Sequence, residues 1–203
     1  MLGGDHHKVH FVSCSGSTTV DLLDSTKPDN QINAITNGAS FATLSIGGND
    51  VLFGLIVKSC IYGVLEAGDC TENKKKGTET LYGRAFFDRY NEVLTRIVKE
   101  KMGYHSSVSR TLLYQTSYSQ FFDDWTDDCD NRKLHWWVNA KKMKKPLREE
   151  FNHMVHQLNE ILQYWMDIRN TEWTRSGWIP GGPSQFFTGV DWIDVDWKFN
   201  NHR

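Results

Sequence analysis

The sequence predicts a single α/β domain over residues 1–203, folded as a three-layer α/β/α sandwich around a parallel sheet. Two observations predict this class. Short stretches typical of strands alternate along the chain with amphipathic helices. The strands are also apolar nearly throughout, which is expected when helices cover both faces of a parallel sheet.

Four stretches are typical of buried strands because they are short, rich in β-branched and aromatic residues, and bounded by turn residues. The first, KVHFVSC, ends in Ser-Gly-Ser, and the second, SFATLSIG, runs into Gly-Gly-Asn-Asp. The predicted strands are residues 8–14, 40–47, the beginning of 110–122, and 189–197. Residues 177–186, with the sequence GWIPGGPSQF, are predicted to form a loop because glycine and proline are frequent there.

Three segments between the strands are predicted to be helices. Residues 18–25 open with threonines that can cap a helix. Residues 82–102 carry apolar side chains at helical spacing and end before Gly103, a common helix terminator. Residues 146–169 show the clearest apolar stripe and begin with Pro146, which suits a first helical turn.

Composition and charge exclude several classes of protein. The formal net charge of -2 lacks the basic excess of a dedicated nucleic-acid binder, so we expect no nucleic-acid partner. The lysine clusters at 74–76 and 141–145 are predicted to be solvated, and an acidic run at 123–130 precedes the second. No stretch approaches the ~18 apolar residues of a membrane span, so no transmembrane segment is expected. The N-terminus, MLGGDHHKVHF, lacks the apolar core of an export signal.

The cysteines predict a disulfide rather than a metal site. Cys60 and Cys70 bracket a short loop, and a bond between them would add roughly 2–3 kcal/mol to stability. The alternative is two free thiols in a cytosolic protein. A disulfide implies an oxidising, secreted setting, which conflicts with the missing export signal. No Cys-x-x-Cys pair exists, and His153 and His156 lack a carboxylate ligand set, so we expect no metal and no other cofactor.

Two turns rich in small residues carry the chemistry. The turn Gly47-Gly48-Asn49-Asp50 follows a predicted strand, and ligands of parallel sheets bind beyond such carboxyl ends. The Asn49 side chain can donate a hydrogen bond to a developing oxyanion, or it can merely bond its own backbone. The turn CSGSTT, residues 14–19, also follows a strand, and its Gly16 can offer an unobstructed backbone N–H before a helix start. Together the turns predict two donors directed at one point.

In order and spacing these motifs resemble those of the SGNH, or GDSL-type, serine ester hydrolases. FVSCSGSTTVDLL is similar to the second block of that family, and LSIGGNDVLFG is similar to its third. The terminal DVDWKFNNHR resembles the last block of the secreted fungal and actinobacterial branch. The resemblance covers most of the chain and implies a flavodoxin-like fold and a serine mechanism. It also implies that Gly16 and Asn49 are oxyanion-hole donors and that His202 is the general base.

The chain departs from the family pattern at both ends. It contains no Gly-Asp-Ser block and therefore no identified nucleophile; the nearest echo, Gly4-Asp5-His6, has histidine in place of serine. We expect the first strand and nucleophile to be absent, and the chain to be an inactive fragment truncated at both termini. The resemblance implies that Cys14 and Cys129 pair with cysteines outside these residues.

The group that orients His202 has more than one candidate. The position three residues before the histidine, where the family commonly has aspartate, is Phe199. Asp196 is the preferred catalytic acid, with Asp194 further away, and a backbone carbonyl is the alternative. His202 itself has an alternative interpretation, since a histidine near a chain end is commonly only exposed to solvent.

The sequence therefore predicts that the complete parent protein is a secreted esterase or lipase. Lipids, short-chain esters and acylated sugars all remain candidate substrates, and the sequence names no oligomeric state. The alternative function is a non-catalytic domain that binds lipid or carbohydrate in an aromatic-lined cleft. Four tryptophans near the C-terminal loops fit such a cleft, although packing in the core is the more ordinary role for them: Trp173, Trp178, Trp192 and Trp197.

Overall fold

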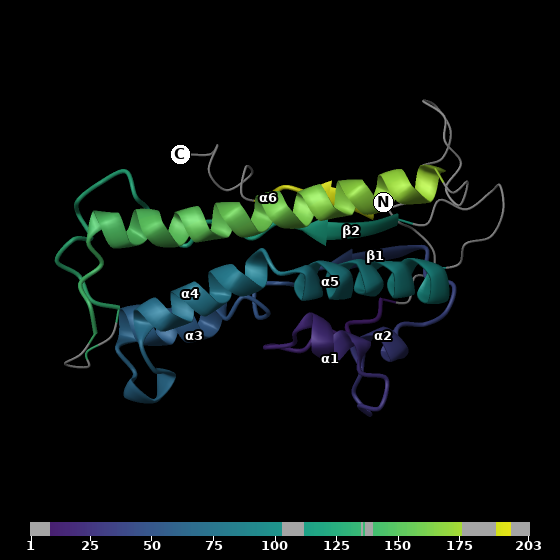
Figure 1. The fold of residues 1–203 in the computed structure, drawn as a ribbon, viewed down its shortest axis with the longest axis horizontal. Helices are drawn as coiled ribbons and strands as arrows, with labels where there is room; N and C mark the ends of the chain where they lie inside the picture. The colour runs from purple at the N-terminus through teal and green to yellow at the C-terminus, as the bar shows by residue number, and fades with distance from the viewer. Residues whose placement is uncertain (1–8, 103–111, 135, 137–139, 176–189, 196–203) are drawn as a thin grey trace.

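The computed structural model describes residues 9–102, 112–134, 136, 140–175 and 190–195, and shows parallel strands packed against long helices (Figure 1). The helices are α1 (Thr19–Leu23), α2 (Gln31–Ala34), α3 (Phe53–Val57), α4 (Cys70–Leu81), α5 (Arg84–Arg96) and α6 (Lys145–Arg175). The strands are β1 (Phe41–Leu44), β2 (Leu112–Thr116) and β3 (Val190–Ile193). Short irregular helical segments occupy Lys58–Tyr62, Leu65–Ala67 and Ile97–Lys101.

The sheet of the described residues has the order β1-β2-β3, and both pairings are parallel. The register aligns Ala42 with Leu113 and Leu113 with Val190. The predicted α/β class with a parallel sheet is therefore confirmed, and the arrangement agrees with a three-layer α/β/α hydrolase fold. Because all three strands run the same way, the segments that follow them emerge at one edge of the sheet.

The main core lies between the sheet and helices α5 and α6. Leu113 and Val190 are buried in the same cluster as apolar residues of both helices. The Trp165 ring of α6 meets the rings of Phe86 and Phe87 of α5 edge-on, at centroid distances of 5.2 and 5.3 Å. Edge-to-face contacts of this kind favour a fixed mutual position of two helices.

The three predicted helices are present, each with shifted ends. Thr18 caps α1 through a capping box with Asp21, as its threonine-rich start indicated. The predicted helix 82–102 is α5, continued by a π-helical turn to Lys101. Helix α6 extends six residues beyond the predicted end at 169, to Arg175, and its apolar stripe continues to the buried Trp173.

The prediction of a strand at 8–14 is wrong for the described residues 9–14, which have no regular secondary structure. Val9 and Phe11 are 91% and 86% exposed. Among the described residues β1 is an edge strand, and nothing pairs with its outer side. An apolar run forms a strand only when a neighbour satisfies its backbone groups, and here none is in place.

The disulfide between Cys60 and Cys70 is confirmed, with Cα atoms 4.8 Å apart. It joins the turn after α3 to the first residue of α4, two helices that the sequence pattern did not indicate. Lys74 of the first lysine cluster, predicted to be solvated, forms an ion pair with Glu150 of α6 at 2.5 Å. The predicted loop at 177–186 and the helix end at Gly103 lie outside the described residues.

Candidate functional site

The turn after β1 is tightly packed at both of its glycines. Gly47 has a φ of 116°, and a Cβ placed there would lie 3.2 Å from the Phe86 ring and 3.3 Å from Leu162. A Cβ at Gly48 would lie 3.1 Å from the Tyr118 ring. Glycine is therefore favoured at Gly47 by both its backbone conformation and close packing, and at Gly48 by close packing alone. The Gly-Gly pair places Asn49 and Asp50 at the carboxyl end of β1.

The second turn also needs glycine, but for conformation alone. Gly16 has a φ of 83°, and a Cβ there would meet no atom within 4 Å. The space around Gly16 is open, as expected for a backbone donor that a ligand can approach. The following helix, α1, has only five residues, so the contribution of its dipole is small.

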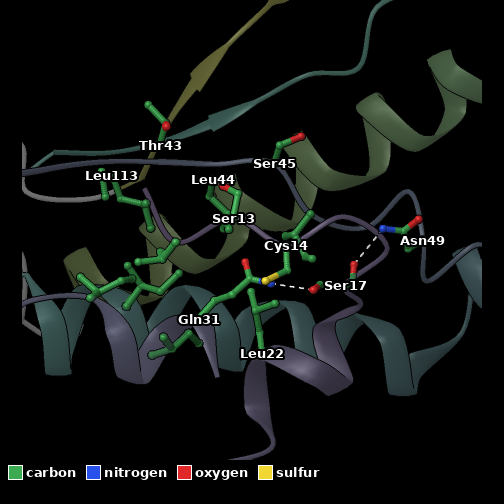
Figure 2. A pocket seen from close by; sticks show the side chains of 16 residues that line it. Ser13, Cys14, Ser17, Leu22, Gln31, Thr43, Leu44, Ser45, Asn49 and Leu113 are labelled. Atoms are coloured by element: carbon green, nitrogen blue, oxygen red, sulfur yellow. Dashed lines mark hydrogen bonds between the residues drawn. The ribbon is translucent and has the colours of Figure 1, made fainter. Parts of the chain in front are cut away.

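A hydrogen bond joins the two turns. The Nδ2 atom of Asn49 donates to the backbone oxygen of Ser17 over 2.9 Å, as Figure 2 shows. Ser17 directly follows Gly16, so the two predicted oxyanion donors lie on adjoining turns. The side chain of Asn49 therefore bonds the neighbouring turn and not its own backbone, which was the alternative considered from the sequence.

A buried carboxylate makes the second connection between the turns. The Oδ1 and Oδ2 atoms of Asp50 accept from the backbone N–H of Thr19 at 3.1 and 3.0 Å, and Oδ1 accepts from the Thr19 hydroxyl at 2.5 Å. From α5, the Nε of Arg89 donates to the same hydroxyl at 3.0 Å, and its guanidinium lies 3.8 Å from Asp50. Burial raises the pKa of Asp50, while the Thr19 bonds and the Arg89 charge oppose that rise.

The segment after β2 supports the Gly48 side of the site. The backbone N–H of Gly48 donates to the Tyr118 hydroxyl at 3.1 Å, and burial raises the pKa of that phenol. Asn159 of α6 holds the backbone of Tyr118 by accepting from its N–H and donating to its carbonyl, both at 2.8 Å. Sequence reasoning missed these supports and also Thr19 and Arg89. The one available signal was asparagine within the apolar stripe of α6.

A cavity of about 110 Å³ lies beside this junction, between residues 12–17 and β1 with the residues just after it (Figure 2). Its walls include polar side chains from both turns, and Gln31 donates to the Ser17 hydroxyl at 2.6 Å across it. The cavity is also lined by Ala42, Thr43 and Leu44 of β1, which is an edge strand among the described residues. Its polar and thiol-bearing lining residues are Ser13, Cys14, Ser17, Gln31, Thr43, Ser45 and Asn49.

The fold resembles a solved lipase structure. The crystal structure of phospholipase A1 from Streptomyces albidoflavus NA297 superposes with a TM-score of 0.56 and 15% identity. The match covers 89% of this chain and 71% of the phospholipase chain. No protein-family model and no curated protein sequence matches the chain. At this identity the likeness establishes a shared fold.

The remaining predicted residues have different positions relative to the site. His202 and Asp196 lie outside the described residues. Asp194, the weaker alternative acid, follows β3 and accepts a bond from the Ser117 hydroxyl at 3.3 Å, so it lies at the same edge of the sheet as the turns. Cys14 and Cys129 are exposed free thiols.

Metal-binding and membrane-spanning features are described for residues 9–102, 112–134, 136, 140–175 and 190–195. These ranges contain no group of three or more His, Cys, Asp or Glu side chains that could hold a metal ion. None of their helices has the length and apolar character needed to cross a bilayer.

Proposed function

We propose that this chain contributes the oxyanion-binding side of a serine hydrolase that cleaves carboxylic esters of lipids. The observation that carries the proposal is the hydrogen bond from Asn49 to Ser17, which brings the two predicted donors onto adjoining turns. Asn49 lies beyond the carboxyl end of β1, which is the usual place for a site in a parallel sheet. The phospholipase whose fold the chain resembles favours a lipid ester as substrate.

The chemistry follows from the donors that these turns can offer. The amide of Asn49 has two N–H groups, and only one is needed for the bond to Ser17. The other N–H and the backbone N–H of Gly16 would stabilise the negative oxygen that forms when a nucleophile attacks an ester carbonyl. Because Asp50 and Tyr118 hold the turns, these donors need little reorganisation during the reaction.

The proton transfers are assigned to His202. A serine hydroxyl attacks the ester carbonyl and gives its proton to His202, which then protonates the leaving alcohol. Water regenerates the serine by the same path in the second half of the reaction. Asp196 would orient the imidazole. In this proposal the serine comes from a segment outside these 203 residues, seated along the outer edge of β1 beside the cavity.

The second function considered is non-catalytic binding of lipid or carbohydrate. Two observations favour it: the sequence has no Gly-Asp-Ser block, and one donor of Asn49 is already bonded to Ser17. The disulfide between Cys60 and Cys70 fits an exported protein under either function, and we propose secretion for both.

The test begins with the nucleotide sequence upstream of Met1. An in-frame Gly-Asp-Ser block there supports the hydrolase, and a transcript that starts at Met1 supports the binding domain. In the extended protein, Asn49→Ala should lower kcat by roughly 10²–10³ with KM little changed. The matched control is Asn33→Ala, an exposed asparagine of α2 outside the site, which should leave kcat unaltered. An unchanged kcat in Asn49→Ala removes this residue from the mechanism.

The 203-residue chain alone should hydrolyse p-nitrophenyl acetate negligibly, because the proposed nucleophile is not part of it. Robust turnover that is lost in His202→Ala would show that a serine or cysteine within the chain acts as nucleophile. That result would retain the hydrolase but overturn the proposed source of its serine.

A further inference from the structure

Large apolar side chains are exposed around the beginning of α6. Phe121, Trp125, Leu134 and Trp136 are 54%, 79%, 52% and 87% exposed, and we call these four residues the apolar tip. Figure 1 shows the connection from β2 to α6 at the end of the molecule where α6 begins, beyond α3 and α4. Single exposed apolar residues are ordinary, but four large ones on the one connection between β2 and α6 indicate an interaction surface.

A buried arginine fixes the backbone of the tip. The guanidinium of Arg148, in the first turns of α6, donates to the carbonyl oxygens of Asp123 and Thr126 on either side of Trp125. It also donates to the carboxylate of Asp130 at 2.8 Å, and its Nε donates to the carbonyl of Met143 at 2.9 Å. The hydrogen bonds of Arg148 therefore fix the backbone on both sides of Trp125 and with it the exposed position of this residue.

A second clamp holds the other end of the tip. Asn152, one turn further along α6, accepts from the N–H of Phe122 at 3.2 Å and donates to its carbonyl at 2.7 Å. The ring of Phe122 packs against Phe151 in the core, so Phe121, the next residue back, is turned outward. Buried polar side chains of α6 thus hold the backbone in a position that leaves the apolar side chains of the tip exposed to solvent.

The charges around the tip favour an anionic partner. Of the aspartates in residues 121–145, Asp123, Asp124 and Asp130 are half-buried, and each accepts a hydrogen bond from the protein. The cations of the same segment are instead mostly exposed, and a β-bridge places Lys133 and Lys142 side by side. The exposed cations are Arg132, Lys133, Lys141, Lys142 and Lys144, against exposed Asp127 and Asp128.

Contacts connect the tip to the candidate site. The ring of Phe121 stacks on Phe53 at a centroid distance of 4.8 Å. Phe53 begins α3, and its backbone N–H donates to the carbonyl of Gly48 in the turn that carries Asn49. Three residues before Phe121, Tyr118 accepts from the N–H of the same glycine. A surface bound by the tip would therefore lie against the segment that supports the site.

We propose that the apolar tip seats the protein on lipid bilayers that carry anionic headgroups. Tryptophan and phenylalanine partition into the interfacial region of a bilayer, and neighbouring lysines are attracted to anionic lipids. The relevance of this surface to substrate rests on the proposed function, since it would bring a lipid ester to the Asn49 turn from an aggregate. Binding itself requires no catalysis and is measurable on the 203-residue chain.

The test is co-sedimentation with vesicles of phosphatidylcholine mixed with phosphatidylglycerol. The double variant Trp125→Ala, Trp136→Ala should reduce the partition coefficient by about tenfold or more, because both rings are exposed and would lose their burial in lipid. The matched control is Tyr164→Ala, a 63% exposed aromatic in the middle of α6, which should bind as wild type does. Circular dichroism of each variant checks that the fold is kept.

The electrostatic part has its own test. Binding of the wild type should fall as salt is added, and it should be weaker on vesicles of phosphatidylcholine alone. No binding to mixed vesicles, or equal binding by wild type and the double variant, would overturn the proposal. Equal binding to both vesicle types would overturn its anionic component. If the tip binds vesicles but the extended protein cleaves no ester, the proposed function fails and the docking surface stands.

Discussion

The substitution Gly77→Ala sets two opposing effects against each other. Gly77 is buried in the middle of α4, on the face that packs against α3. In an open helix, alanine in place of glycine stabilises by about 1 kcal/mol. Here, however, the added Cβ would lie 2.5 Å from the backbone oxygen of Val51 and 3.0 Å from Cδ1 of Ile56.

The packing effect should win because a backbone carbonyl cannot turn aside as a side chain can. Overpacking of this kind costs about 1–3 kcal/mol, and the short contact to Val51 places Gly77 at the upper end of that range. After the propensity gain is subtracted, a net loss of about 2 kcal/mol remains. In a protein of this size that loss lowers Tm by roughly 4–8 °C.

The matched control is Gly54→Ala in α3. Gly54 is exposed, and a Cβ there would meet no atom within 4 Å, so only the propensity gain applies. Urea unfolding followed by circular dichroism at 222 nm should show the Gly54 variant slightly more stable than wild type and the Gly77 variant clearly less stable. If Gly77→Ala stabilises as much as Gly54→Ala does, α4 does not pack against Val51 as described.

Two further substitutions test the supports of the site. Asp50→Asn should destabilise by about 1–3 kcal/mol, because the NH2 group that replaces Oδ2 cannot accept from the N–H of Thr19 and the negative charge that faces Arg89 is lost. Since burial raises the pKa of Asp50, its proton is bound more tightly in the folded state, and its contribution to stability falls as pH rises through that raised pKa. The free energy of unfolding can be measured by denaturant at a series of pH values between acidic and neutral. The decrease of this free energy with rising pH that Asp50 causes should be absent in Asp50→Asn. An unchanged dependence on pH would contradict a raised pKa at Asp50. Asn159→Ala should destabilise by about 2 kcal/mol or more, because it leaves the N–H and carbonyl of Tyr118 without their partner. Unfolding within about 0.5 kcal/mol of wild type would show that water replaces the amide.

Sequence patterns predicted those elements in which buried apolar residues recur at regular spacing. Helix α6 and the strand β2 show such spacing and were predicted correctly in place and type. Helix α4 shows none, because its buried positions are Asn73, Gly77 and Leu81 and the rest of the helix is polar. The apolar run at 9–14 shows the opposite failure: it has the composition of a strand but no described neighbour to pair with.

The candidate site likewise has parts that the sequence could predict and parts that it could not. The Gly-Gly-Asn-Asp turn and the Ser-Gly turn were visible because glycine among small polar residues is a local signal of a turn. The residues that hold them are not local: Arg89 is 39 positions from Asp50 in the sequence, and Tyr118 and Asn159 come from other elements. Their roles depend on which segments the fold brings together, and the asparagine within the apolar stripe of α6 was the one sign of this in the sequence.

Packing explains the glycines and Asp50 of the turn, but it does not explain Asn49. Gly47 and Gly48 avoid clashes with Phe86 and Tyr118, and Asp50 bonds Thr19 in a buried position. Asn49 is exposed, and its side chain makes a single bond in the described structure, to the carbonyl of Ser17. Exposed hydrogen bonds contribute little to stability because water competes for both partners. Folding therefore gives this position little reason to be asparagine, and the proposed role as a donor to an oxyanion would supply one.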